Sequence, residues 1–197
     1  FELFSQMASQ IAKQLTVWQD LGFEQHICIN ADAAEFSHPD FFDLVSNLLD
    51  SHKLAAHQLH IEVTESSLIQ RHANVKKQLD SLKELGICLA LDDFGTGFAS
   101  LSYLQEYPFD FIKIDKSFIS KITNDRTQRA IVKAILDLAE ALDMHVIAEG
   151  IENVQQRDLL LSMGCQYGQG YWFGKPMTAD EATKMLTQQH LSKNDRP

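Results

Sequence analysis

Two adjacent aspartates, Asp92 and Asp93, stand at the end of a short apolar run over residues 87–93. Neighbouring carboxylates repel each other, and the repulsion is strong where they are shielded from water. A divalent cation removes that penalty, and two such ions about 3.5–4 Å apart are a common device for splitting a phosphodiester. Because both side chains can turn inward where a strand gives way to a loop, the pair indicates a two-ion hydrolytic site.

Polar residues stand at the same place in the other short apolar runs of the sequence. They are Asn30, Glu62, Lys113 with Asp115, Glu149 and Gln169. Side chains alternate along a strand, so these groups face away from their apolar neighbours. One amide and several carboxylates, without a paired His or Cys, form an all-oxygen donor set that suits Mg²⁺ or Mn²⁺ better than zinc. For a single residue a helix cap or a surface ion pair explains the polarity equally well, so the argument depends on the set.

The spacing of apolar residues predicts the elements that must carry these groups. Short strands are expected over 26–30, 59–63, 87–93, 111–115, 145–150 and 167–173. Helical spacing predicts helices over 75–85 and 129–142, and capping-box spacing predicts helix starts at Asn153 and Thr178. Gly22, Gly86 and Gly164 each follow a helical segment, where a left-handed residue is favoured. Alternation of strand and helix predicts a parallel sheet covered by helices.

The number of strands favours an α/β barrel that is incomplete at its N-terminus. An eight-stranded barrel needs about 250 residues, and two more strand–helix units would add roughly 65 residues to this chain. The chain also opens within a helical pattern, so we expect the first strands upstream of Phe1. Residues 1–189 are expected to form the barrel domain, and residues 190–197 a polar tail that frays. The alternative is a doubly wound open sheet, which needs no missing piece.

The composition restricts the class of protein. The chain of 197 residues carries 17 basic and 27 acidic residues, a net charge of −10, which argues against binding DNA or RNA polymers. An anionic small ligand stays compatible with this charge if a metal ion binds it. Cys28, Cys88 and Cys165 lack paired spacing and predict buried, reduced thiols rather than a disulfide framework or a zinc pattern. The histidines form no metal-binding pair in sequence, and His60 and His145 are expected in the core.

Five short motifs occur in a fixed order along the chain. They are IEVTES over 61–66, DDFGTG over 92–97, IKID over 112–115, AEGIE over 148–152 and QGY over 169–171. Their order and spacing resemble the EAL-domain family of bacterial cyclic-di-GMP phosphodiesterases, over nearly the whole chain. The resemblance implies a TIM-type (β/α) barrel, a two-metal site for Mg²⁺ or Mn²⁺, and hydrolysis of cyclic di-GMP to linear pGpG.

The resemblance also implies a set of metal ligands. Asn30, Glu62 and Asp92 look like ligands of the first ion, with Asp92 bridging to the second. Asp93 would serve the second ion. Glu149 would hold the second ion or a water molecule, and it would act as the catalytic base.

Further roles follow from the same resemblance. Lys113 would position the attacking water or stabilise negative charge that develops on the phosphate. Glu65 looks like the anchor of the DDFGTG loop. Asp115, Glu152 and Gln169 look like positions that contact the substrate or support the ligands. For Asp115, a cap on the helix that begins near Lys116 is nearly as good an explanation.

The same resemblance extends to partners and cellular context. We expect cyclic di-GMP as the substrate or ligand and a regulatory domain upstream of this segment. The domain is expected in the bacterial cytoplasm, either in a cytosolic protein or as the cytosolic part of a membrane-anchored protein. The segment itself is expected to make no membrane contact, because it contains no apolar run of the required length. Apolar residues over 98–104 and Phe118 are candidates for a homodimer surface, although core packing explains them equally well.

The sequence departs from the family at one important position. The Glu-Ala-Leu motif that names the family, whose Glu binds metal, has no counterpart on a strand; Glu140-Ala141-Leu142 falls in a predicted helix. A substrate-binding Arg is absent as well, Ala31-Asp32 replaces Leu-Ser after Asn30, and Phe98 replaces Tyr. Either the missing Glu lies upstream of Phe1, or the domain is a non-catalytic receptor or interaction module. A third alternative is an unrelated barrel enzyme that stabilises an enolate with Lys113 and the carboxylates.

Overall fold

The protein forms one parallel sheet whose strands follow each other in chain order. The structure is a computed structural model that describes residues 1–69, 73–96 and 101–194. Its strands are β1 Ile27–Ala31, β2 Leu59–Thr64, β3 Cys88–Phe94, β4 Phe111–Ile114, β5 His145–Ala148 and β6 Tyr167–Gly168. Each pairs in parallel with the next, without any reversal of order. This is the order of a barrel; a doubly wound sheet reverses at a switch point, so that alternative is wrong.

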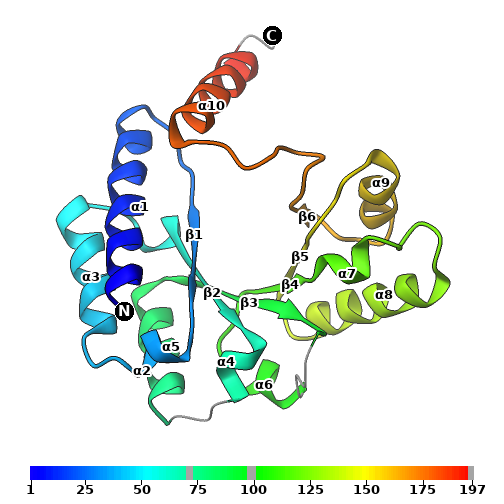
Figure 1. Cartoon of the computed structure of the whole chain (residues 1–197), viewed down its shortest axis with the longest axis horizontal. Coiled ribbons are helices and arrows are strands. Elements are labelled where there is room, and N and C mark those ends of the chain that lie inside the picture. Colours follow the sequence, from blue (N-terminus) through cyan, green and yellow to red (C-terminus); the bar gives the residue numbers. More distant parts are fainter. Residues whose placement is uncertain (70–72, 97–100, 195–197) are drawn as a thin grey trace.

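Helices cover the outer face of the curved sheet (Figure 1). The longer ones are α1 Glu2–Asp20, α3 Phe41–His52, α5 Ala73–Leu85, α8 Arg126–Ala141, α9 Val154–Ser162 and α10 Ala179–Asn194. The shorter ones are α2 Ala33–Ser37, the 3₁₀ turn η1 Ala56–Gln58, α4 Glu65–Ile69, α6 Leu101–Glu106 and α7 Lys116–Ile119. None of the helices within the described residues has the length and apolar character needed to cross a bilayer.

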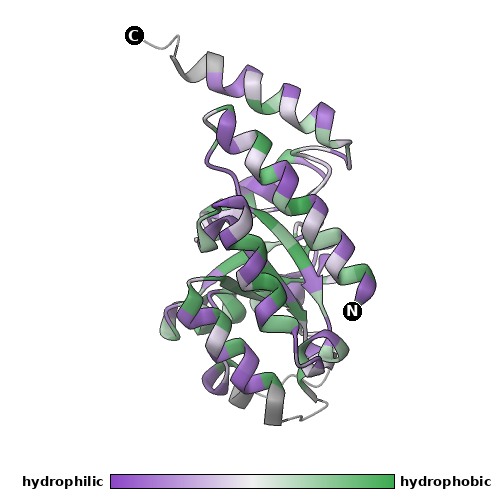
Figure 2. Ribbon diagram, turned by 90° about the vertical axis from the view of Figure 1, so that its left-hand side faces the viewer, coloured by the Kyte–Doolittle hydropathy of each residue, from purple (hydrophilic) through white to green (hydrophobic). Residues whose placement is uncertain are grey.

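The core lies between the outer face of the sheet and these helices. Strand residues such as Ile61, Leu91 and Ile112 are fully buried against helix residues such as Leu79 and Leu82. In Figure 2 the strands are mainly hydrophobic, whereas the helices carry polar residues on their outer sides. Because side chains alternate along a strand, Asn30, Glu62 and Lys113 face the inside of the curved sheet, away from their buried apolar neighbours.

Local signals in the sequence set the helix boundaries. Asn153 and Gln156 form the predicted capping box at the start of α9. Thr178 and Glu181 exchange the equivalent bonds before α10. Gly22, Gly86 and Gly164 all have positive φ, as expected for residues that follow a helix.

Two predicted segments differ from the structure. The strand predicted over 167–173 ends at Gly168, because the chain then turns around Ile151: Ile151 N donates to Gln169 O, and Trp172 N donates to Ile151 O. At the C-terminus, α10 continues to Asn194, so the first part of the predicted frayed tail is helical. Trp18 Nε1 donates to Thr183 Oγ1 at 2.8 Å and joins α10 to α1.

The cysteines are free thiols, as predicted, but they differ in burial. Cys165 is buried and Cys88 is half-buried, whereas Cys28 is exposed. Burial was therefore the wrong expectation for Cys28, which lies in β1, an edge strand of the described sheet.

Aromatic and imidazole rings fill the inner face at the N-terminal ends of the strands. The rings of His26 and His60 stack at 4.0 Å, and Phe111 lies 5.6 Å from His60 and 5.9 Å from Tyr167. His60 is 7% exposed, as expected for a core histidine, whereas His145 is exposed. Burial lowers the pKa of His60 to about 4, and His26 adds to this effect.

The shifted pKa of His60 predicts a loss of stability in mild acid. The ordinary pKa of a histidine is 6.5, so as the pH falls below this value the imidazole of residue 60 is protonated in the unfolded chain but stays neutral in the folded chain. Between about pH 7 and pH 5 the wild-type chain should lose about 2 kcal/mol more of its free energy of unfolding than His60→Gln. Urea titrations across this range measure the difference; parallel pH profiles for the two proteins would contradict it.

Any side chain at position 170 is expected to clash with the backbone of Ile151. A Cβ atom at this position would lie 2.2 Å from the carbonyl oxygen and 2.3 Å from the nitrogen of Ile151. Gly170→Ala should therefore cost about 2–3 kcal/mol in the free energy of unfolding. Gly174→Ala is the control, because its Cβ meets only the flexible end of Met177 at 3.3 Å; equal effects of the two substitutions in urea denaturation would refute the assignment.

Candidate active site

The side chain of Lys113 is the centre of a buried cluster of opposite charges. Its Nζ lies 2.7 Å from Glu62 Oε2, 3.0 Å from Asp92 Oδ1 and 2.8 Å from Glu149 Oε1. Lys113 is only 3% exposed. One ammonium group therefore holds three carboxylates together inside the curved sheet.

Four consecutive strands bring these groups together. Glu62 lies in β2, Asp92 near the end of β3, Lys113 in β4, and Glu149 directly after β5. Ala90 is the β3 residue opposite Glu62, and its small side chain leaves room for Lys113 to reach Glu62 across the strand. All four groups lie toward the C-terminal ends of their strands, where barrel enzymes place their active sites.

The adjacent aspartates are turned toward the same site by a β-bulge. The register between β3 and β4 shifts between Leu91 and Phe94, and Asp93 has a positive φ of 56°. A bulge of this kind re-aims a side chain that regular alternation would send to the other face. Carboxylate oxygens of Asp92, Asp93 and Glu149 consequently lie within 4.8 Å of one another.

The clustered charges perturb one another. Burial raises the pKa of Asp93, and the charges of Asp92 and Asp115 raise it further. Burial also raises the pKa of Glu149 against the opposing effect of Lys113. For Lys113, burial disfavours the charged form, but hydrogen bonds to Glu149, Glu62 and Asp92 outweigh it and raise the pKa above its usual range. The site therefore keeps its ammonium and carries an excess of negative charge.

This donor set fits hard divalent cations. All the converging ligand atoms are carboxylate oxygens, the donors that Mg²⁺ and Mn²⁺ prefer. Burial is the main cause of the raised pKa values of Asp93 and Glu149, and the neighbouring carboxylates add to it. A bound cation would remove the repulsion among these carboxylates.

Glu65 holds the loop that follows the two aspartates. It is 3% exposed, and its Oε2 accepts a hydrogen bond from Gly95 N at 3.3 Å. Its other oxygen, Oε1, is buried without a hydrogen-bond partner among the described residues. Gly95 has a φ of +93°, and a Cβ there would press on the Phe118 ring at 3.1 Å. The contact ties β2 to the end of β3.

The remaining predicted site residues lie around this cluster. Asn30 of β1 is the register partner of Glu62 and is exposed. Asp115 caps α7 through Ser117 N at 2.9 Å, which together with the Lys116 charge lowers its pKa despite burial. Glu152 and Gln169 are exposed. The backbone of Gln169 bonds to Ala148 and Ile151, so it stands beside the end of β5.

The proposed dimer residues fall largely outside the described part of the chain. Phe98 belongs to the undescribed residues, and the same holds for the side chains of 101–103. Leu104 is buried, and Phe118 is half-buried against the core. A homodimer surface in this region stays a prediction.

The structure contains one cluster of histidine and cysteine side chains that was not predicted from the sequence. His26, Cys28 and His60 lie within 4.8 Å of one another, although no pairing of His or Cys in sequence indicated a site. The two-residue step from His26 to Cys28, which places both on one face of a strand, was the available signal.

The fold and the site define an α/β barrel protein with a carboxylate-rich centre at the C-terminal ends of its strands. The EAL domain model matches residues 1–176. The signalling protein YkoW of Bacillus subtilis is 38% identical over 180 residues, 91% of this chain and 22% of YkoW. The bifunctional diguanylate cyclase/cyclic di-GMP phosphodiesterase MucR of Pseudomonas aeruginosa is 36% identical over 87% of this chain and 25% of MucR. The chain belongs to the EAL domain family.

Solved structures agree with this assignment. The PaMucR phosphodiesterase in complex with c-di-GMP superimposes with a TM-score of 0.86 and 34% identity, over 92% of this chain and 74% of that one. The manganese/cy-diGMP complex of Klebsiella pneumoniae BlrP1 gives a TM-score of 0.78 and 30% identity, over 89% and 45%. The chain spans about a quarter of the length of the curated relatives named above.

Removal of the central ammonium should destabilise the metal-free protein. Lys113→Met leaves Glu62, Asp92 and Glu149 facing one another without a counter-charge, which should cost about 3 kcal/mol in the free energy of unfolding with a chelator present. Added Mg²⁺ should restore more stability to this variant than to the wild type. Urea denaturation with and without Mg²⁺ measures both effects.

Lys133→Met is the matched control for this experiment. Lys133 pairs with Asp137 at the exposed surface of α8 at 2.6 Å, so its loss should change the stability by less than about 1 kcal/mol. Equal losses in the two variants, or no difference in their response to Mg²⁺, would contradict the central role of Lys113.

Proposed function

We propose that the chain is the catalytic domain of a metal-dependent cyclic-di-GMP phosphodiesterase, which hydrolyses cyclic di-GMP to linear pGpG. The observation that carries the proposal is the cluster around Lys113, where three carboxylates meet at the C-terminal ends of the strands. Membership of the EAL domain family supports the choice of substrate. The cyclic-di-GMP complexes belong to related proteins, so the ligand of this chain is part of the proposal.

The metal ligands in this proposal are Asn30, Glu62, Asp92, Asp93 and Glu149. Asn30, Glu62 and Asp92 would hold the first ion, Asp92 and Asp93 the second, and Glu149 the second ion or a water molecule. Mg²⁺ and Mn²⁺ suit these oxygen donors. When bound, the ions lower the pKa of water and neutralise negative charge on the phosphodiester.

The side chains of the protein perform the other parts of the reaction. Hydrolysis forms a bond from a water oxygen to phosphorus and breaks the bond from phosphorus to a ribose oxygen, which takes up a proton. Lys113 holds the attacking water in place and stabilises charge on the phosphoryl oxygens. Glu149 accepts a proton from the water, a role that suits a carboxylate whose pKa is raised.

Residues around the cluster position the substrate and the ligands. Glu65 holds the loop after Asp93 through Gly95 N. Asp115 fixes the start of α7 beside Asp93. Glu152 and Gln169 lie exposed beyond the end of β5, and in this proposal they would contact the nucleotide. We further propose that the domain acts in the bacterial cytoplasm under the control of a regulatory domain, and that it pairs with a second copy of itself.

The direct test is turnover of cyclic di-GMP. Because a Glu-Ala-Leu strand is absent from these 197 residues, the protein is expressed together with its natural upstream sequence. Chromatography should then show Mg²⁺- or Mn²⁺-dependent conversion to pGpG. Asp92→Asn should reduce the rate by at least about 100-fold, the usual cost of one preorganised polar group in a site.

Asp137→Asn provides the matched control, since Asp137 lies exposed on α8 and pairs only with Lys133 among the described residues. This variant should keep wild-type turnover. Binding of cyclic di-GMP without turnover would overturn the phosphodiesterase proposal and favour a receptor module, while neither binding nor turnover would favour a protein-interaction role.

A further inference from the structure

A second group of side chains of metal-binding types lies on the inner face one layer below the carboxylates, where burial and the neighbouring Glu62 raise the pKa of the Cys28 thiol. His26 precedes β1, Cys28 lies in β1, and His60 lies in β2. One ligand atom from each of the three residues lies within 4.8 Å of the other two. The proposed hydrolytic site uses none of these groups.

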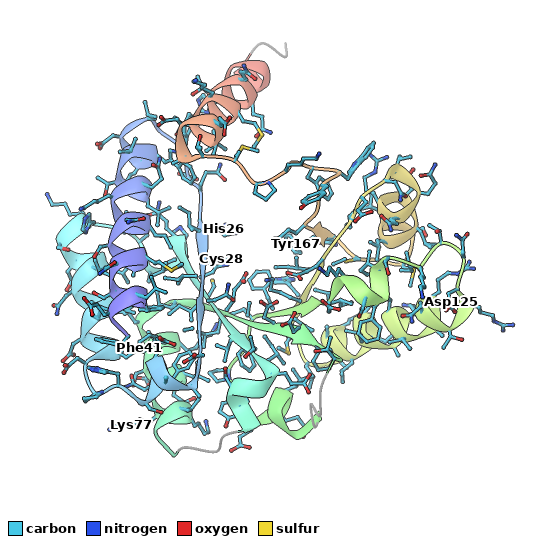
Figure 3. The ribbon with its side chains drawn as sticks, in the orientation of Figure 1. His26, Cys28, Phe41, Lys77, Asp125 and Tyr167 are labelled. Carbon is cyan, nitrogen blue, oxygen red and sulfur yellow. The ribbon has the colours of Figure 1, made fainter. Side chains whose placement is uncertain are left out.

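The parallel register explains why these side chains meet. Cys28 is the partner of His60, and Asn30 is the partner of Glu62 two residues further along. Residues two apart in a strand share a face, so the His and Cys side chains form a layer beneath the oxygen donors. Figure 3 shows His26 and Cys28 on the side of β1 that faces the interior of the curved sheet.

We propose that His26, Cys28 and His60 form a second metal site, for a borderline-soft divalent ion such as Zn²⁺. Two imidazole nitrogens and one thiolate are donors that select zinc over Mg²⁺. A tetrahedral zinc ion places such ligand atoms about 3.3–3.7 Å apart, which side-chain rotation within the observed 4.8 Å allows. The rings of His26 and His60, which stack at 4.0 Å, would have to leave this parallel arrangement to bind one ion.

The surroundings of the three side chains fit this role. His60 is buried, whereas His26 and Cys28 are exposed in the described chain, and a water molecule would complete four ligands around an ion. Binding converts the Cys28 thiol to a thiolate and releases its proton to solvent.

Co²⁺ is the probe for this site, because a thiolate bound to Co²⁺ gives a charge-transfer absorption that carboxylate oxygens do not give. The full chain is titrated with Co²⁺ in excess Mg²⁺, which occupies the oxygen donors. The wild type should show the absorption at one equivalent, and Zn²⁺ should remove it, since zinc binds such ligands more tightly.

Cys28→Ser should abolish the absorption, and Cys88→Ser should keep it, because Cys88 lies outside the cluster. His26→Asn, a change at an exposed position, should weaken Co²⁺ binding by more than about tenfold, because even supporting contacts around a metal are worth about 10–100-fold. This variant carries the test if Cys28→Ser fails to fold, as judged by circular dichroism. Absence of the absorption in the wild type, its survival in Cys28→Ser, or unchanged binding in His26→Asn would each overturn the proposal.

Discussion

Electrostatic repulsion among buried carboxylates is the constraint on which the rest of this structure depends. Glu62, Asp92 and Glu149 all contact one ammonium, that of Lys113. Three negative charges face one positive charge, and Asp93 adds a fourth negative charge beside them. Charges taken out of water need partners, so the sheet must hold four strand ends in register for the cluster to exist. The fold and the site therefore depend on each other.

Much of the architecture could be predicted because it depends on local patterns. Alternation of strand and helix predicted the parallel sheet, and capping residues such as Asn153 predicted helix boundaries. The strand predicted over 167–173 was wrong because a tertiary contact decides its length: the backbone of Ile151 occupies the space beside Gly170 and bends the chain after Gly168. Apolar periodicity carries no information about such a contact.

In the site, too, some features follow from local sequence patterns and others depend on tertiary contacts. Polar residues at strand ends predicted which side chains belong together, and the structure places Glu62, Asp92, Lys113 and Glu149 in contact. The position of Lys113 between the carboxylates could not be predicted, since it depends on the small Ala90 and on the register of three strands. Cys28 was misjudged because its exposure follows from the edge position of β1, which an apolar sequence setting does not reveal.

The bulge in β3 has a consequence for how the gene can change. Within a regular strand, two neighbouring residues point to opposite faces, so an odd-numbered irregularity is what allows Asp92 and Asp93 to serve one site. Asp92 and Asp93 are the only residues between Leu91 and Phe94, so an in-frame loss of one codon there would remove the bulge together with one of the two carboxylates and leave the other alone on the inner face. The length of this segment is therefore tied to the site, because both aspartates reach the inner face only while β3 keeps its extra residue.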